Sequence, residues 1–221
     1  MMLQNCKLTY FNLPGRGESA RLALSIGNID FTDERIQFSQ WKQLKPKTPW
    51  GSLPVLTLSD GTAIAQQRAI LRLIGKETGL YPTGAIEAAM VDEIMDAVED
   101  IQVKTNSLGN GLPQDEKEAA RKAACTEGGV TYDILKRIDG VIGSHEGCYA
   151  VGESLTIADL CIYVGTSTLI SGLYDGVPPD ALSYFDHLAG LRKTVRSNPA
   201  ICKWYDGLDD SMKVPSSFGK I

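Results

Sequence analysis

The sequence predicts two domains of different fold class, an α/β domain followed by an all-helical domain. Up to about residue 82, short apolar segments with strand character alternate with helical segments. Beyond Tyr81-Pro82-Thr83-Gly84 the strand signals stop, and apolar residues recur at helical spacing through to the C-terminus. We therefore expect one domain over residues 1–82 and a second over residues 83–221.

The first 82 residues read as strand, helix and strand, followed by two strands and a helix. The strands are expected over residues 3–11, 31–36, 55–58 and 62–65, and the helices over residues 16–27 and 67–78. Asp60-Gly61 is a strong hairpin signal, because glycine takes a positive φ without strain. The segment through Lys47 reads as a polar connection. This order of elements is that of a thioredoxin-like sheet with helices on its faces.

The second domain begins with an amphipathic helix that carries an acidic face. Its apolar stripe consists of Val91, Ile94, Met95, Val98 and Ile101. The next helix is expected over residues 115–142, with a bend or break at Gly128-Gly129, since each glycine costs ~1 kcal/mol relative to alanine. Thr156 and Asp159 have the spacing of a capping box before an apolar run, which supports folding rather than chemistry.

Composition excludes several classes of function. The formal net charge of −5 and the lack of a Lys/Arg block give no reason to expect a nucleic-acid partner. The most apolar later stretch, residues 157–173, contains Asp159 and reads as a buried helix, so no membrane partner is expected. His145 and His187 are isolated from each other and from cysteine pairs, so no metal site is expected.

The cysteines and the N-terminus indicate a cytoplasmic protein. The five cysteines are scattered and never in C-x-x-C spacing, which fits free buried thiols in a reducing compartment. No basic region followed by an apolar run is found at the N-terminus, so we expect neither a secretory signal nor a transit peptide.

Two sequence blocks contain the candidate catalytic and binding residues. In the first, a strand ends at Tyr10 and Phe11, and Leu13-Pro14-Gly15-Arg16-Gly17-Glu18 opens a helix, which aims a phenol and a guanidinium at one pocket. In the second, Trp50-Gly51-Ser52-Leu53-Pro54-Val55-Leu56 leads on to polar amides in Ala65-Gln66-Gln67-Arg68 at another helix start. Together the blocks resemble the glutathione-binding domain of a cytosolic glutathione transferase, most like the sigma class. The resemblance covers nearly the whole chain and implies the glutathione transferase fold.

The resemblance implies that Tyr10 and Arg16 are catalytic. The Tyr10 hydroxyl would donate a hydrogen bond to the glutathione sulfur and favour the thiolate. A free thiol has a pKa of ~8.5, so lowering it by two units requires ~2.7 kcal/mol, within reach of a charge-assisted hydrogen bond and a nearby cation. Arg16 is the candidate cation. The alternatives are a core tyrosine in a strand and an ordinary surface arginine.

The resemblance also implies binding roles around the tripeptide. Trp41 and Lys45 are four residues apart, hence on one face of a helical turn, and would bind the glycyl carboxylate. A packed tryptophan beside an exposed lysine is the alternative. The backbone of Leu53 would bind the cysteinyl unit, and the Leu53-Pro54 peptide bond is expected to be cis.

Gln66 and Gln67 would hold the γ-glutamyl end, at a helix N-terminus where unpaired N–H groups favour an anion. Two positions depart from the family pattern. The family usually has Ser in place of Gln67, and commonly Gln or Lys in place of Ser52. We expect glutathione binding that persists but is weaker than typical.

The second domain would complete the site and the dimer. The resemblance implies that Asp100 crosses a homodimer interface to the amino group of glutathione in the neighbouring subunit; a solvated helix face is the alternative reading. The electrophile pocket would be bounded by Phe11 and Leu13, the 106–112 region and Phe218. Some sigma-like prostaglandin D synthases bind a divalent ion through acidic residues in this region, but the set is incomplete here, so no metal is expected.

We therefore interpret the chain as a homodimeric glutathione transferase that takes glutathione as co-substrate and conjugates it to a small hydrophobic electrophile. The absence of a cysteine at or next to position 10 argues against classes that perform disulfide exchange. Two alternatives stay open at this point. One is a glutathione-dependent isomerase of the prostaglandin D synthase kind, and the other is a crystallin-like or ligand-carrying protein of the same fold.

Overall fold

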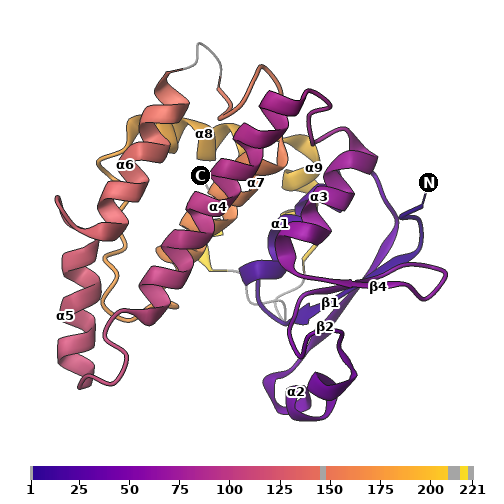
Figure 1. Ribbon diagram of the computed structural model, residues 1–221, viewed down its shortest axis with the longest axis horizontal. Helices are drawn as coiled ribbons and strands as arrows, with labels where there is room; N and C mark the ends of the chain where they lie inside the picture. Colours follow the sequence, from indigo (N-terminus) through magenta and orange to yellow (C-terminus); the bar gives the residue numbers. More distant parts are fainter. Residues whose placement is uncertain (1, 145–147, 209–214, 219–221) are drawn as a thin grey trace. The chain divides into compact units, whose positions relative to one another are not determined.

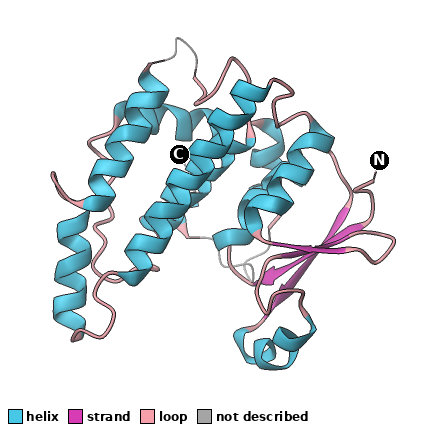
Figure 2. Ribbon diagram, in the orientation of Figure 1, coloured by secondary structure: helices cyan, strands magenta, loops and turns pink. Residues whose placement is uncertain are grey.

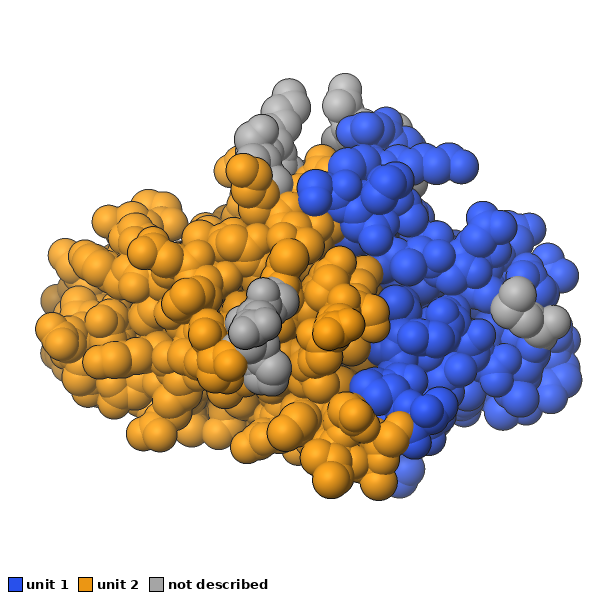
Figure 3. Space-filling model, turned by 90° about the horizontal axis from the view of Figure 1, so that it is seen from above, with its two compact units in different colours: residues 1–83, 197–214 blue, residues 84–196, 215–221 orange. Residues whose placement is uncertain are grey.

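A computed structural model describes residues 2–144, 148–208 and 215–218 (Figure 1). The chain forms two compact units (Figure 3). Unit 1 comprises residues 1–83 and 197–214, and unit 2 comprises residues 84–196 and 215–221. The α/β class of the first part and the helical class of the second are as the sequence predicts (Figure 2). The functional division of the chain at residue 82 stays a prediction.

Unit 1 is built on a four-stranded mixed sheet in the order β2-β1-β3-β4. The strands are β1 (Cys6–Phe11), β2 (Phe31–Ile36), β3 (Val55–Thr57) and β4 (Ala63–Ala65). β1 runs parallel to β2 and antiparallel to β3, and β3 runs antiparallel to β4. β1 starts later than expected, because Asn5 takes a left-handed conformation with a φ of 58°. The interior strand β1 therefore delivers Tyr10 opposite Arg35 of β2.

Three helices cover this sheet unit. α1 (Gly15–Ile26) packs against α3 (Gln67–Thr78) and against α9 (Pro199–Asp206), which the chain reaches only after it has passed through unit 2 (Figure 1). Trp204 of α9 stacks on Phe31 with ring centroids 5.9 Å apart. Its indole N–H donates to the Glu18 carboxylate at 3.0 Å, so the C-terminal helix belongs to the core of unit 1.

The polar connection before Lys47 contains a short helix that the sequence interpretation missed. α2 (Phe38–Leu44) is followed by a 3₁₀ turn, Lys45–Lys47. None of the α2 residues is buried, and a helix of seven residues is too short for its apolar positions Phe38, Trp41 and Leu44 to form a clear periodic pattern. Its start is fixed instead by an exposed capping box, in which the Gln37 backbone N–H donates to the Gln40 side chain at 2.7 Å.

Unit 2 is helical throughout its described residues. Its elements are α4 (Ala85–Ser107), α5 (Gln114–Ala124), α6 (Val130–Gly143), α7 (Ile157–Leu169), α8 (Asp186–Arg196) and a 3₁₀ turn (Ser216–Phe218). Every residue of α7 is buried, and α4, α8 and the 3₁₀ turn pack against it. α7 is therefore the centre of the unit 2 core, as the apolar run in the sequence predicts. No helix within the described ranges is long and apolar enough to cross a membrane.

The break predicted at Gly128-Gly129 separates α5 from α6. Gly128 has a φ of +81°, in the region that favours glycine. A side chain at Gly129 would place its Cβ 2.4 Å from the carbonyl oxygen of Ala123. Both glycines are therefore required for the turn.

The predicted capping box at the start of α7 is confirmed. The fully buried Asp159 carboxylate accepts from the backbone N–H of Thr156 at 2.7 Å and from the Thr156 hydroxyl at 2.9 Å. Its other oxygen accepts from the Ala150 N–H at 2.8 Å. Burial raises the pKa of Asp159, although these hydrogen bonds act in the opposite direction. One carboxylate thus fixes both the preceding loop and the first turn of the central helix.

The five cysteines are free, as expected, but they are not all buried. Cys6, Cys125 and Cys161 lie in the core, whereas Cys148 is exposed. Burial raises the pKa of Cys125 to about 11, so this thiol is almost wholly protonated at neutral pH.

We expect Asp159→Ala to lower the free energy of unfolding by about 3 kcal/mol, because it leaves buried donors of Thr156 and Ala150 without an acceptor. The matched change Gln40→Ala, in the exposed capping box of α2, should cost about 0.5 kcal/mol or less. Urea unfolding followed by circular dichroism measures both. Equal losses in the two variants would contradict the role assigned to Asp159.

Candidate functional site

Tyr10 lies at the end of β1, where the chain turns into α1, and its side chain is nearly buried at 7% exposure. Its hydroxyl oxygen accepts a hydrogen bond from the backbone N–H of Arg16 at 3.0 Å. Arg16 is the second residue of α1, so the donor is one of the N–H groups without a partner inside the helix. The positive end of the helix dipole therefore points at the phenol oxygen.

Gly15 makes this approach possible. Its φ is +44°, and a Cβ at this position would lie 2.9 Å from the Tyr10 hydroxyl and 2.7 Å from the Leu13 side chain. The turn between strand and helix thus requires a residue without a side chain.

This arrangement suits a hydrogen-bond donor to an anion. A phenol oxygen that accepts from an N–H becomes more acidic, and the hydroxyl can still donate its own proton. Donation to a thiolate is charge-assisted, which makes it shorter and stronger than a neutral bond. The local chemistry of Tyr10 therefore agrees with the role that the sequence pattern implies, while the contact with sulfur stays a prediction.

An aromatic cluster extends from Tyr10 to α2. Phe11 makes an edge contact with Tyr10 at a centroid distance of 5.6 Å, and it makes another with Trp41 at 5.7 Å. Phe38 stacks on Phe11 at 4.5 Å, although 68% of its own surface is exposed. The structure thus brings two predicted residues, Phe11 and Trp41, together. It adds Phe38, whose only signal in the sequence is its spacing of three residues from Trp41.

Lys45 precedes the second sequence block, and the Leu53-Pro54 pair lies within it. The exposed Lys45 side chain passes over Gly51, with its Cε 3.6 Å from the position that a Cβ would take there. The Leu53-Pro54 peptide bond is cis, as predicted from the resemblance. Leu53 itself is half-buried and lies two residues before the start of β3.

Gln66 and Gln67 begin α3. Gln66 has a φ of +73°, which is rare for a residue with a side chain and is typical of functional sites. Its side chain is exposed. The amide of Gln67 donates to the Ser19 hydroxyl at 3.4 Å, so this longer side chain has a partner on α1. The positive φ at Gln66 gives no signal in the sequence.

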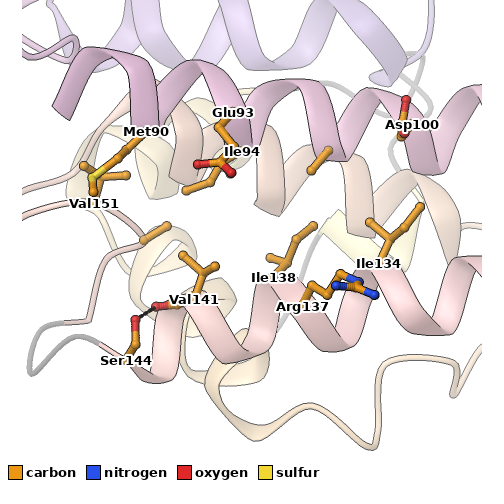
Figure 4. A pocket seen from close by; sticks show the side chains of 12 residues that line it. Met90, Glu93, Ile94, Asp100, Ile134, Arg137, Ile138, Val141, Ser144 and Val151 are labelled. Carbon is orange, nitrogen blue, oxygen red and sulfur yellow. Dashed lines mark hydrogen bonds between the residues drawn. The ribbon is translucent and has the colours of Figure 1, made fainter. Parts of the chain in front are cut away.

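Asp100 lies on α4 in unit 2, and 61% of its side chain is exposed. It forms an ion pair with Lys104, one turn later in the helix, at 2.8 Å. Asp100 also lines a pocket of about 490 Å³ between α4 and α6, and Arg137 of α6 lines the same pocket (Figure 4). The rest of the lining is mainly apolar and includes Ile94, Ala97, Ile134, Ile138 and Val141.

Two further predictions concern unit 2. Phe218, expected to line an electrophile pocket, leaves 1% of its surface exposed and makes an edge contact with the Tyr163 ring. Its carbonyl accepts from the Tyr163 hydroxyl at 2.7 Å, so it belongs to the core of the unit. The described part of the chain contains no group of three His, Cys, Asp or Glu side chains placed to hold a metal, and His145 lies outside the described residues.

Comparison with known proteins agrees with the geometry. Residues 6–76 match the N-terminal domain of glutathione S-transferases, and residues 105–207 match their C-terminal domain. The chain belongs to the glutathione S-transferase family. Among its relatives, glutathione S-transferase 1 of Ascaris suum is 36% identical over 90% of the chain and 94% of the relative. The hematopoietic prostaglandin D synthase of Gallus gallus is 33% identical over 91% and 96%.

A solved structure extends this comparison to the fold. A monomeric glutathione S-transferase of Necator americanus superposes on this transferase with a TM-score of 0.78 at 26% identity, covering 93% of the chain and 98% of the neighbour. The family and its members named glutathione S-transferase support a glutathione transferase activity for the chain.

We expect Gly15→Ala to lower kcat/KM at least about tenfold, because the new methyl group displaces the Tyr10 hydroxyl from the Arg16 N–H. Gly79→Ala is the matched control, since Gly79 has a φ of +77° and no atom within 4 Å of the added Cβ. It should cost about 1 kcal/mol of stability and leave turnover unchanged. The measurement is the steady-state kinetics of both variants. An unchanged kcat/KM in Gly15→Ala would contradict the role assigned to the turn.

Proposed function

We propose that this transferase binds glutathione in unit 1 and that Tyr10 stabilises the glutathione thiolate by donating a hydrogen bond to its sulfur. The observation that most supports the proposal is the hydrogen bond from the Arg16 N–H to the Tyr10 hydroxyl oxygen. It orients the phenol and polarises it toward donation. The side chain of Arg16, half-buried at the same helix start, is proposed as the nearby cation.

The remaining tripeptide contacts are proposed from the positions around Tyr10. Trp41 and Lys45 would bind the glycyl carboxylate by an indole N–H and by charge. The backbone of Leu53, before Pro54, would pair with the cysteinyl unit as an added strand does. The γ-glutamyl end would bind at Gln66 and Gln67, where the N-terminus of α3 favours a carboxylate.

The proposed reaction is direct conjugation. The thiolate attacks an electrophilic carbon, a new C–S bond forms, and the leaving group departs with the bonding electron pair. No covalent enzyme intermediate is involved, so catalysis consists of ionising and positioning the nucleophile. Phe11 and Leu13 would supply apolar contacts for a small hydrophobic electrophile.

Tyr10→Phe should raise the apparent pKa of the conjugation rate toward that of free glutathione, because the variant loses the donor to the thiolate. At a pH well below that pKa the rate should fall about a hundredfold if the wild-type shift is about two units. The measurement is the pH dependence of kcat/KM with a generic aryl halide. A wild-type apparent pKa that is no lower than the pKa of free glutathione would exclude the proposed role of Tyr10.

We also propose that the transferase is a homodimer in which Asp100 reaches the glutathione amino group of the neighbouring subunit. The chain exposes apolar surface that a second copy could cover, namely the pocket between α4 and α6 and the Trp50 indole, which is 73% exposed. Glutathione transferases form dimers typically, although the Necator neighbour is named as monomeric. The class assignment as sigma-like and a cytoplasmic location are part of the same proposal.

Asp100→Asn should weaken glutathione binding about threefold to tenfold, because it removes a charged partner of an ammonium group. Glu93→Gln is a suitable control, since Glu93 is an exposed acidic residue of α4 that lines the same pocket. Titration of glutathione by calorimetry, with the oligomeric state measured by sedimentation in parallel, tests both parts. A monomer whose affinity is unaffected by Asp100→Asn would reject the shared site.

A second candidate function is a glutathione-dependent isomerase. The similarity to the hematopoietic prostaglandin D synthase of Gallus gallus, 33% identical over 91% of the chain, favours this candidate specifically. Such an enzyme would use the same glutathione thiolate, stabilised by Tyr10, but would return glutathione unchanged. Turnover of a cyclic endoperoxide without net consumption of glutathione distinguishes it from a general transferase.

A further inference from the structure

A buried ionic network surrounds the turn between β1 and α1. Its centre is Arg21 of α1, whose side chain is fully buried together with that of Glu18. The Arg21 Nη1 lies 3.0 Å from a Glu18 oxygen, and its Nε lies 2.9 Å from Asp33 of β2. Burial lowers the pKa of Arg21, but the two carboxylates outweigh it and raise the pKa above its usual value. The guanidinium is therefore a permanent cation in the core.

The other hydrogen bonds of the Arg21 guanidinium are to backbone carbonyls of the turn that follows Tyr10. Nη1 donates to the carbonyl oxygens of Leu13 at 2.9 Å and Pro14 at 3.4 Å. Nη2 donates to the carbonyl oxygen of Phe11 at 3.4 Å. One rigid, planar group thus holds both ends of the turn, which a lysine ammonium with a single nitrogen cannot do.

The same guanidinium contacts Tyr10 itself. Its central carbon lies 5.7 Å from the centroid of the Tyr10 ring, within the range of a cation–π interaction. Arg21 therefore acts on the phenol from two sides. It contacts the ring, and it fixes the turn that presents the Arg16 N–H to the hydroxyl oxygen.

Stability alone gives a poor account of this network. Replacing a buried ion network by apolar side chains of similar volume is often neutral or stabilising, because desolvation offsets the attraction between the charges. What the network supplies specifically is a fixed geometry for the turn and for the phenol. We propose that Arg21 is a positioning residue for the transferase reaction, holding the 11–14 turn and the Tyr10 ring so that the Arg16 N–H stays on the hydroxyl oxygen.

This inference rests on the proposed function of Tyr10, and the test separates the two. The pH dependence of kcat/KM for conjugation is measured for wild type, Tyr10→Phe, Arg21→Lys and Arg21→Met. In Arg21→Met the apparent pKa should rise, so that the rate well below this pKa falls about tenfold while the limiting rate at high pH changes less than about twofold. Arg21→Lys keeps the positive charge but loses the planar guanidinium with its several donors. Its apparent pKa should rise by less, so that the rate at low pH falls at least about threefold.

Arg35→Lys is the matched control. Arg35 is also nearly buried, with 8% of its side chain exposed, and its Nε binds the other oxygen of Asp33 at 2.6 Å. Its two Nη atoms make no hydrogen bond within the described structure, so this arginine does not hold the turn. The pH profile of Arg35→Lys should coincide with that of the wild type. Binding of S-methylglutathione, which has no ionisable thiol, should change less than about twofold in every folded variant.

Several outcomes would overturn the inference. An unchanged apparent pKa in folded Arg21→Met would do so, and if that variant does not fold, an unchanged apparent pKa in Arg21→Lys is sufficient. An equal shift in Arg35→Lys would assign the effect to the charge of the network rather than to the turn, and would also reject the proposal. If wild type and Tyr10→Phe share one profile, the proposed function of Tyr10 fails, and the role of Arg21 fails with it.

Discussion

The hydrogen bond from the Arg16 N–H to the Tyr10 hydroxyl is the interaction on which the account of this transferase depends. It exists because a central strand ends one short turn before a helix begins, so the helix N-terminus faces the last inward side chain of the strand. Gly15 allows the close approach, and the buried Arg21 fixes the carbonyls of the turn. The position of the Tyr10 hydroxyl is thus set by backbone geometry.

The two compact units contribute different things. Unit 1 contains most of the predicted glutathione contacts, on the ends of its strands and at two helix starts, and the C-terminal helix α9 completes its core. Unit 2 is organised around the buried helix α7, whose first turn is fixed by Asp159. It presents the pocket between α4 and α6 on its surface. A separate α/β part for the co-substrate, as proposed, suits a family whose second substrates vary.

Much of this could be predicted from the sequence, because the signals are local. Turns and helix caps are specified by a few neighbouring residues, so they can be predicted from a short stretch of sequence. Examples are the turns at Asp60-Gly61 and Gly128-Gly129 and the capping pair Thr156 and Asp159. The helix α2 was missed because its seven residues are too few for a clear periodic pattern, although Trp41 and Lys45 were placed on one helical turn. The return of α9 to unit 1 depends on distant contacts of Trp204. The role of Arg21 was missed for the same reason. Its partners are Asp33 on another strand and backbone carbonyls of the turn, and no local spacing in the sequence indicates these contacts.

The most direct test of the central claim is the ionisation of glutathione bound to the enzyme without an electrophile. Titration of the ultraviolet absorbance of the thiolate in the binary complex reports the pKa of the bound thiol independently of turnover. The account predicts a value about two units below the ~8.5 of a free thiol. A bound thiol that titrates like free glutathione would contradict the role assigned to Tyr10, whatever the rate of conjugation.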